Sequence, residues 1–315
     1  MRIVFMGTPD FAVASLNTLL DNGYEVAAVV TQPDKPKGRK RTLTPPPVKE
    51  AALARGLQVL QPARMRSPEA VEALAALQPD LIVTAAYGQI LPKEVLELPR
   101  LGCINVHGSL LPRYRGGAPI QRAIINGEAV TGVTIMYMAE GLDTGDMISR
   151  VEVPILDSDT SGDLFAKLSE AGAQLLAQTL PSIVDGTASA TPQNHEEATY
   201  APNLNREDER LDWNRSAREL YNQVRGLAPM AGAFTYLNGE VFKVWACKPE
   251  PQSDDSAAAP GTVLPGASGS LLVQTGDGAL RLLTIQPAGK KAMDAEAWLQ
   301  GARLPAGTRF GGEPQ

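Results

Sequence analysis

Apolar and polar positions follow one pattern before about residue 190 and a different one after it. In the first part, short apolar runs that predict strands take turns with segments in which apolar residues recur at helical spacing. The predicted strands are 2–7, 24–32, 57–62, 80–86, 102–108, 132–138 and 147–155. The predicted helices lie near 11–20, 48–55, 68–77, 92–98, 118–126 and 164–183. This alternation predicts βαβ units.

The early strands are apolar and β-branched along most of their length, as RIVFMG at 2–7 and DLIVTAA at 80–86 illustrate. Strands of this kind are typical of a parallel sheet that helices cover on both faces. We therefore predict an α/β domain with a Rossmann-like, mostly parallel sheet. Open α/β sheets bind ligands beyond the carboxyl ends of their strands, so the site is expected at that edge.

The segment ATPQNHEEATYAPNLN at 190–205 is polar, rich in proline and asparagine and without periodicity, which predicts a linker. A short helix follows at 216–224, where Ser216 and Glu219 fit a capping box. The strands predicted beyond it are 233–237, 240–246, 261–264, 270–275 and 279–285. Short strands joined by tight turns predict a smaller, OB-like β-barrel. The expected domains are thus 1–189 and 206–315, joined by 190–205.

Composition narrows the class of protein further. The 315 residues are 43% hydrophobic and 20% charged, as in ordinary globular proteins. The apolar run in MRIVFMG is too short for a signal peptide, and no run of about 18 apolar residues occurs, so we expect a cytoplasmic protein without membrane contact. Two cysteines and two histidines disfavour both a disulfide framework and a metal site. Nothing indicates an oligomer interface, and we expect a monomer.

Two polar side chains stand out in the predicted strand GCINVHG at 102–108. Successive side chains of a strand alternate faces, so Asn105 and His107 point the same way, near the carboxyl end. A Gly-rich loop after a later strand carries Asp143, which could reach the same edge. A carboxylate orients a histidine ring, and an asparagine amide donates hydrogen bonds without titrating. Together these groups suit the stabilisation of an oxyanion and the movement of a proton.

Other catalytic classes fit less well. The residues around Ser109 lack the G-x-S-x-G elbow of a serine nucleophile. The first turn, GTPDFA at 7–12, has one glycine where a dinucleotide loop has three, and Pro9 offers no N–H to a pyrophosphate. Cys103 lies further back in its strand and is interpreted as a core residue.

Several motifs together resemble the folate-dependent formyltransferase superfamily. They are MGTPDFA at 6–12, GCINVHGSLLPRYRGGAPIQ at 102–121, TGVTIM at 131–136, GLDTGDM at 141–147, KVW at 243–245 and IQPAGKKAM at 285–293. The resemblance covers nearly the whole chain. It implies transfer of the formyl group of 10-formyltetrahydrofolate, a co-substrate, to an amine, without a metal. Within the family the chain most resembles the members that act on initiator methionyl-tRNA.

The resemblance also assigns residues. The family's catalytic Asn, His and Asp fall on Asn105, His107 and Asp143. Its folate-contacting segments fall on Ser109, Leu110, Leu111 and Pro112 and on Tyr87, Gly88, Gln89, Ile90 and Leu91, with the backbone of 139–143. Relatives of this fold commonly have a cis Leu-Pro bond here, so Leu111-Pro112 is expected to be cis.

A basic segment indicates where the acceptor binds. The net charge is −6, yet DKPKGRKRTLTPPPVK at 34–49 holds six Lys and Arg against one Asp. On composition alone this is a solvated surface, but the resemblance implies a tRNA-binding loop that sugar and purine formyltransferases generally lack. The residues are Lys35, Lys37, Arg39, Lys40 and Arg41. By the same resemblance the OB-like domain binds tRNA.

Two alternatives stay open at this point. One is a formyltransferase that acts on an amino sugar or a purine precursor with the same Asn-His-Asp centre. The other is a catalytically silent RNA-binding protein on the same scaffold. The basic segment and the second domain disfavour the first, and the intact set of Asn105, His107 and Asp143 disfavours the second.

Overall fold

The chain divides into two structural units. The structure is a computed structural model that describes residues 1–38, 40–251, 258–264 and 269–312. The first unit comprises Met1–Pro119, Val130–Pro154 and Phe165–Pro202. The second comprises Ile120–Ala129, Ile155–Leu164 and Asn203–Gln315. Ile120–Ala129 and Ile155–Leu164 thus belong to the second unit although they lie between segments of the first, so no single boundary along the chain separates the two units.

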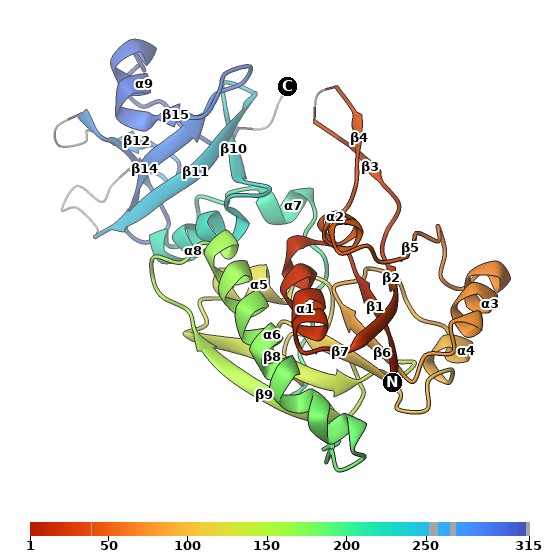
Figure 1. Ribbon diagram of the computed structural model, residues 1–315. Helices are drawn as coiled ribbons and strands as arrows, with labels where there is room; N and C mark the ends of the chain where they lie inside the picture. The colour runs from red at the N-terminus through yellow and green to blue at the C-terminus, as the bar shows by residue number, and fades with distance from the viewer. Residues whose placement is uncertain (39, 252–257, 265–268, 313–315) are drawn as a thin grey trace. The chain divides into compact units, whose positions relative to one another are not determined.

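The first unit is built on one sheet of seven strands in the order β5-β2-β1-β6-β7-β8-β9 (Figure 1). Their bounds are β1 Arg2–Gly7, β2 Glu25–Val30, β5 Val59–Leu60, β6 Leu81–Ala85, β7 Cys103–His107, β8 Val130–Tyr137 and β9 Met147–Pro154. In this sheet order, each neighbouring pair from β5 through β2, β1 and β6 to β7 is parallel, whereas β8 is antiparallel to both β7 and β9. The mostly parallel sheet expected from the sequence is confirmed.

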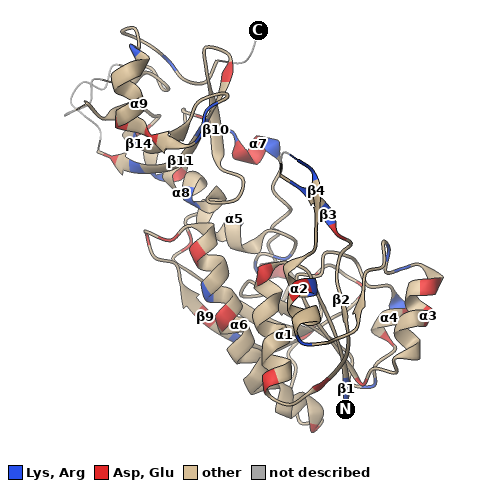
Figure 2. Cartoon of the chain, turned by 45° about the horizontal axis from the view of Figure 1, so that its top comes forward, with Lys and Arg blue, Asp and Glu red and all other residues tan. Residues whose placement is uncertain are grey.

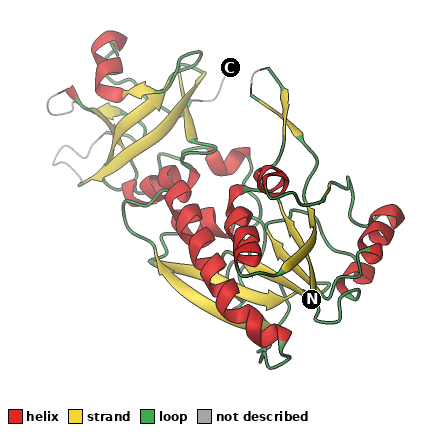
Figure 3. Cartoon of the chain, in the orientation of Figure 1, coloured by secondary structure: helices red, strands yellow, loops and turns green. Residues whose placement is uncertain are grey.

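Helices cover both faces of this sheet (Figure 3). They are α1 Asp10–Asp21, α2 Pro47–Ala54, α3 Pro68–Ala76, α4 Lys93–Leu96 and α6 Ser161–Val184. On one face α6 packs closely, since a Cβ at Gly172 would lie 3.0 Å from Val106. On the other face Val4, Ile82 and Cys103 form a core with residues of α3 and α4. The apolar runs are therefore buried on both sides, which is why they show no alternation.

The second unit holds an antiparallel sheet in the order β10-β11-β14-β13-β12, with β15 paired to β14. Its strands are β10 Ala233–Leu237, β11 Glu240–Glu250, β12 Val263–Leu264, β13 Leu271–Gln274, β14 Ala279–Gln286 and β15 Met293–Asp294. Its helical segments are α5 Pro119–Ile125, α7 Arg206–Glu209, α8 Ala217–Leu227 and α9 Ala295–Ala302. The predicted capping box is confirmed, because Ser216 and Glu219 bond each other's backbone at the start of α8. The predicted fold class holds for both units.

Aromatic side chains fill the core of the second unit. Phe242 and Phe310 have ring centroids 5.0 Å apart, and Trp213 lies 5.9 Å from Phe310. The Trp213 indole donates to the Thr235 hydroxyl, so its buried N–H is satisfied. Phe242 lies in β11, whereas Trp213 and Phe310 lie outside the strands, in the segments before α8 and after α9. Together they give a small sheet enough apolar area to form a core. None of the helices within the described residues is long and apolar enough to cross a membrane.

Candidate active site

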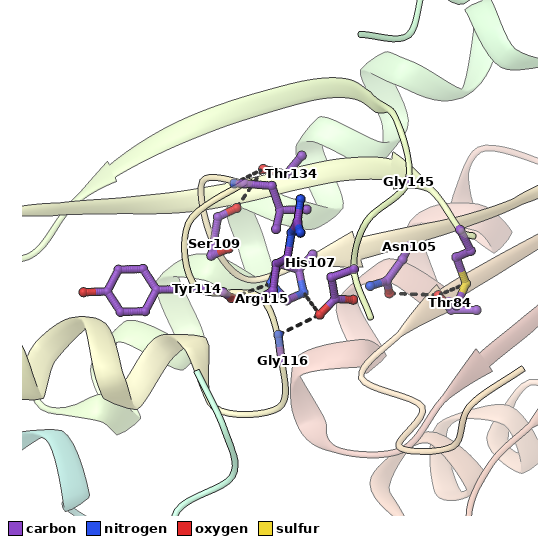
Figure 4. A network of polar contacts seen from close by, with 12 residues as sticks. Thr84, Asn105, His107, Ser109, Tyr114, Arg115, Gly116, Thr134 and Gly145 are labelled. Carbon is purple, nitrogen blue, oxygen red and sulfur yellow. Dashed lines mark hydrogen bonds and ion pairs between the residues drawn. The ribbon is translucent and has the colours of Figure 1, made fainter. Parts of the chain in front are cut away.

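The amide of Asn105 is oriented by the neighbouring strand. Asn105 lies in the middle of β7 and pairs with Thr84 of β6. The buried Thr84 hydroxyl lies 2.8 Å from Asn105 Oδ1 and donates to it (Figure 4). An amide whose oxygen is held in this way presents its NH₂ group as the donor toward a ligand. The structure records no hydrogen bond from that NH₂ group to the described part of the chain.

The ring of His107, at the end of β7, is held by a backbone carbonyl. Its Nε2 lies 3.0 Å from the carbonyl oxygen of Tyr114. Because a carbonyl only accepts, Nε2 carries a proton and donates it, which leaves the lone pair of the neutral ring on Nδ1. Nδ1 faces Asp143, whose Oδ2 is 3.7 Å away. The ring, 6% exposed, is thus fixed with Nδ1 as the nitrogen that can take up a proton.

Asp143 reaches His107 on a loop that has to fold back. Strand β8 is antiparallel to β7, so its last residue, Tyr137, pairs with Ile104 near the beginning of β7. The loop that follows returns toward the end of β7. There the backbone N–H of Gly116 donates to Asp143 Oδ2 at 2.8 Å. Asp143 itself has a positive φ of 51°.

The distance between His107 and Asp143 suits an ion pair better than a hydrogen bond. The Tyr114 carbonyl holds the ring, and Asp143 is placed to stabilise it once both nitrogens are protonated. With the Asn105 amide, the site combines a neutral donor, a titratable nitrogen and a carboxylate. The sequence predicted that these three groups converge, and the structure places them together in the first unit.

Most of the side chains expected to contact folate are packed inside the protein. The buried ones are Tyr87, Leu91, Ser109, Leu111 and Pro112. Burial raises the pKa of the Tyr87 hydroxyl to about 12, and the Ser109 hydroxyl donates to the Arg113 carbonyl at 2.7 Å. The Gln89 side chain bonds the backbone of Met65 and Pro62. These residues can offer a ligand their backbone, while their side chains shape the loops. The Leu111-Pro112 bond is cis, as expected.

Two apolar side chains stand in the solvent on the loops beside the centre. Ile90, on the loop after β6, is 84% exposed, and Leu142, next to Asp143, is 58% exposed. Loops that combine open apolar side chains with backbone hydrogen-bonding groups suit a flat heterocycle, which needs contacts on its faces and polar partners at its edge. The residues present therefore fit a folate.

The basic segment forms a hairpin after β2, with β3 Lys35–Lys37 paired to β4 Thr42–Thr44. We call residues 35–44 the basic hairpin. Its cations Lys35, Lys37, Lys40 and Arg41 are exposed, whereas Arg39 lies outside the described residues. Figure 2 shows the blue of Lys and Arg along β3 and β4. Lys49 differs from these, because its Nζ lies 2.9 Å from Asp34 at the base of the hairpin. Hydrogen bonds from Gln61 and Lys49 lower the pKa of Asp34.

Several residues of the site gave no sequence signal. Thr84 is one residue among others in an apolar run, and the Tyr114 carbonyl is a backbone group. Gln193 lies in the segment predicted as a linker, yet its side chain bonds the loop that carries Asp143. One signal was present: the Gly-Gly pair after Arg115 indicates a close approach, and a Cβ at Gly116 would lie 2.7 Å from the Ala201 carbonyl.

The chain matches two family models and is similar to known proteins over nearly its whole length. The family model described as "Formyl transferase" matches residues 1–180, and that described as "Formyl transferase, C-terminal domain" matches residues 203–303. The chain is 56% identical over 311 residues to a methionyl-tRNA formyltransferase of Bacillus subtilis (strain 168), covering 98% of each chain. It is 55% identical over 313 residues to a methionyl-tRNA formyltransferase of Geobacillus thermodenitrificans, again with 98% of each chain covered.

Solved structures show the same fold at low sequence identity. HypX from Aquifex aeolicus matches 97% of this chain over 48% of its own, with a TM-score of 0.66 and 19% identity. WlaRD, a sugar 3N-formyl transferase studied in the presence of dTDP and 5-N-formyl-THF, matches 92% of this chain over 99% of its own, with a TM-score of 0.66 and 20% identity.

Proposed function

The chain belongs to the formyl transferase family, and we propose that it transfers the formyl group of 10-formyltetrahydrofolate to the α-amino group of methionine on initiator methionyl-tRNA. The observation that supports methionyl-tRNA as the acceptor is the full-length similarity to methionyl-tRNA formyltransferases, at 56% identity over 98% of each chain. In this proposal residues 1–189 form the catalytic domain, 190–205 link it to the next, and 206–315 form the OB-like domain that binds tRNA.

The chemistry sets two demands on the protein. A free α-amino group titrates near 7.7 to 8.0, and an adjacent ester lowers that value, so much of the methionine amine is neutral at pH 7 and attacks without a strong base. The formylated folate supplies the formyl carbon and departs as an amine that needs one proton. The protein therefore has to stabilise negative charge on the formyl oxygen and to move one proton from the attacking nitrogen to the departing one.

Asn105 and His107 meet these demands in the proposed mechanism. The NH₂ group of Asn105, held in place by Thr84, donates to the formyl oxygen as charge develops there. His107 Nδ1 takes the proton that the methionine nitrogen loses, and the imidazolium returns it to the departing nitrogen. Asp143, 3.7 Å away, stabilises the imidazolium between the two transfers. One C–N bond forms, one breaks, and no proton is left over.

The basic hairpin gives the acceptor a place to bind. Its four described cations are exposed, and it follows a strand whose carboxyl end lies at the same edge of the sheet as the end of β7. Phosphate groups of the tRNA are the natural partners of such charges. Folate contacts are proposed for 87–91 and 109–112, through backbone groups where the side chains are buried.

The test is formyl transfer from 10-formyltetrahydrofolate to two acceptors, charged initiator tRNA and charged elongator methionyl-tRNA. We expect formylmethionine to be recovered from the initiator after hydrolysis of the ester. Transfer to neither tRNA would overturn the proposal, and transfer to an amino sugar in place of tRNA would assign the chain to another branch of its family.

A further inference from the structure

Residues 191–201, from the segment that the sequence predicts as a linker, lie along the loops of the active site. The backbones of Thr191 and Met147 exchange two hydrogen bonds of 2.8 and 2.9 Å. Further on, the Arg115 N–H donates to the Thr199 carbonyl at 2.8 Å, and the Ala201 N–H donates to the Arg115 carbonyl at 2.6 Å. The segment is therefore paired with the chain on either side of the catalytic centre.

Gln193 bonds the loop that carries Asp143. Its Nε2 donates to the Asp143 carbonyl at 2.8 Å and to the Gly145 carbonyl at 2.7 Å. Its Oε1 accepts from Arg115, at 2.7 Å from Nη2 and 3.0 Å from Nε. Gln193 and Arg115 are only 5% and 2% exposed. One buried amide thus joins the Asp143 loop to the turn that follows His107.

Thr199 bonds the turn that orients His107. Its hydroxyl accepts a hydrogen bond of 2.9 Å from the Tyr114 N–H. The carbonyl of the same Tyr114 accepts from His107 Nε2, the bond that leaves Nδ1 as the reactive nitrogen. The position of the histidine ring therefore depends on a backbone unit that Thr199 helps to fix.

We propose that two residues of the segment 191–201, which we call the strap, position the catalytic centre: Gln193 holds Asp143, and Thr199 holds His107. The role rests on the proposed function, since it concerns the geometry of that same reaction. Neither residue touches the reacting atoms, so both are positioning residues.

The need for a strap follows from the direction of β8. Because β8 is antiparallel to β7, its end lies near the beginning of β7, and the loop to Asp143 has to be held back against the sheet edge. Gly145 is too close to Tyr137 to admit a side chain, since a Cβ there would lie 1.8 Å from the Tyr137 carbonyl. A side-chain amide with two carbonyl partners can hold such a loop, whereas a carboxylate in its place would repel both.

The first experiment uses Gln193→Glu in the full-length protein. Glutamate has the same shape and keeps the acceptor for Arg115, but it loses both donors to the Asp143 loop. We expect kcat for formyl transfer to fall about 100-fold, the scale of a misplacement of about 1 Å, with the Michaelis constants for folate and tRNA unchanged. The matched control is Asn194→Ala, whose side chain, among the described residues, bonds Glu196 and Glu197 on the surface. The control should keep the wild-type kcat.

The second experiment reads the protonation of the His107 ring directly, by an NMR signal that needs no substrate, and adds a measurement of kcat. The chain has two histidines, so the side-chain ¹⁵N signals are few enough to assign by a single His107→Gln variant. We expect neutral His107 to carry its proton on Nε2 in the wild type. In Thr199→Val, which removes the hydroxyl of an exposed residue, we expect the Nε2–H form to lose population and kcat to fall about fivefold, the equivalent of one ordinary hydrogen bond.

The outcomes separate the strap from a purely structural role and from the proposed function. Wild-type kcat in Gln193→Glu, or unchanged His107 signals and unchanged kcat in Thr199→Val, would overturn the proposal. The proposal is supported if Gln193→Glu loses kcat while its melting temperature falls by the same amount as that of Asn194→Ala. Should Gln193→Glu fail to fold, Thr199→Val decides. If the wild type formylates no tRNA, the proposed function fails, and the His107 signals still decide whether the strap sets the ring.

Discussion

Replacing Asn105 by alanine tests the centre of the mechanism. The substitution removes the NH₂ group that Thr84 aims toward the ligand through its 2.8 Å hydrogen bond to Oδ1. His107 cannot replace this neutral donor, because its Nδ1 has no proton in the neutral ring. The loss should therefore fall on the transition state, where the formyl oxygen becomes charged.

The expected sizes of the two effects of this substitution differ. Removing one donor of an oxyanion site costs about 100-fold to 1000-fold in kcat, or about 2.7 to 4 kcal/mol. The cost to folding is smaller, because the Thr84 hydroxyl keeps a second acceptor, the Ile104 carbonyl at 3.1 Å. The loss of one hydrogen bond is worth about 0.5 to 1.5 kcal/mol. That is small against a typical stability of about 5 to 15 kcal/mol, so the variant should stay folded.

The assay compares single-turnover formylation with thermal unfolding for the wild type, Asn105→Ala and Thr84→Val. Thr84→Val keeps the amide and removes only the group that orients it, so the amide can turn its oxygen toward the site. Its loss of kcat is then limited to about tenfold, the rate equivalent of that hydrogen bond. Near-normal turnover in Asn105→Ala would remove Asn105 from the mechanism. A larger loss in Thr84→Val than in Asn105→Ala would show that Thr84 acts in some other way.

Three further predictions concern other parts of the chain. Alanine at all four described cations of the basic hairpin should raise the Michaelis constant for tRNA but not for folate, and should reduce the slope of log K against log[salt] by about 0.7 to 0.9 for each phosphate that the variant no longer neutralises; equal effects on both substrates would contradict the assignment. Asp34→Asn should lower the melting temperature at neutral pH, and because hydrogen bonds from Gln61 and Lys49 lower the pKa of Asp34 in the folded state, the difference from wild type should disappear as the pH falls through that lowered value. Burial raises the pKa of the Cys103 thiol to about 12 and that of Cys247 as well, so a thiol reagent at pH 8 should modify neither cysteine until the protein unfolds; rapid labelling of the native protein would refute their place in the core.

Much of the fold could be predicted because its causes are local. The runs at 2–7 and 80–86 are apolar on both faces of a strand, and this property alone indicates a sheet covered on two sides. The capping box of Ser216 and Glu219 begins a helix through hydrogen bonds within one turn. The direction of β8 could not be predicted in the same way, since an apolar strand has the same pattern in parallel and antiparallel pairing.

The candidate site shows the same division between features with local causes and features that depend on distant residues. Asn105 and His107 share a face because strand geometry has a period of two, and the sequence was sufficient to place them together. The roles of Gln193 and Thr199 depend on pairs of residues 50 and 85 positions apart, and a polar segment without periodicity gives no sign of such partners.

The sequence by itself therefore determined which groups are the candidates for the chemistry: an amide and an imidazole on one strand, a carboxylate on a Gly-rich loop, and a cluster of cations after the second strand. Only the tertiary structure decided how those groups are held. Tyr114, not Asp143, holds the His107 ring, Thr84 turns the Asn105 amide, and the strap ties the two loops together. The physical reason is that side-chain identity and strand alternation are properties of neighbouring residues. Tautomer, amide orientation and loop position are set by hydrogen bonds that form only once distant segments have packed.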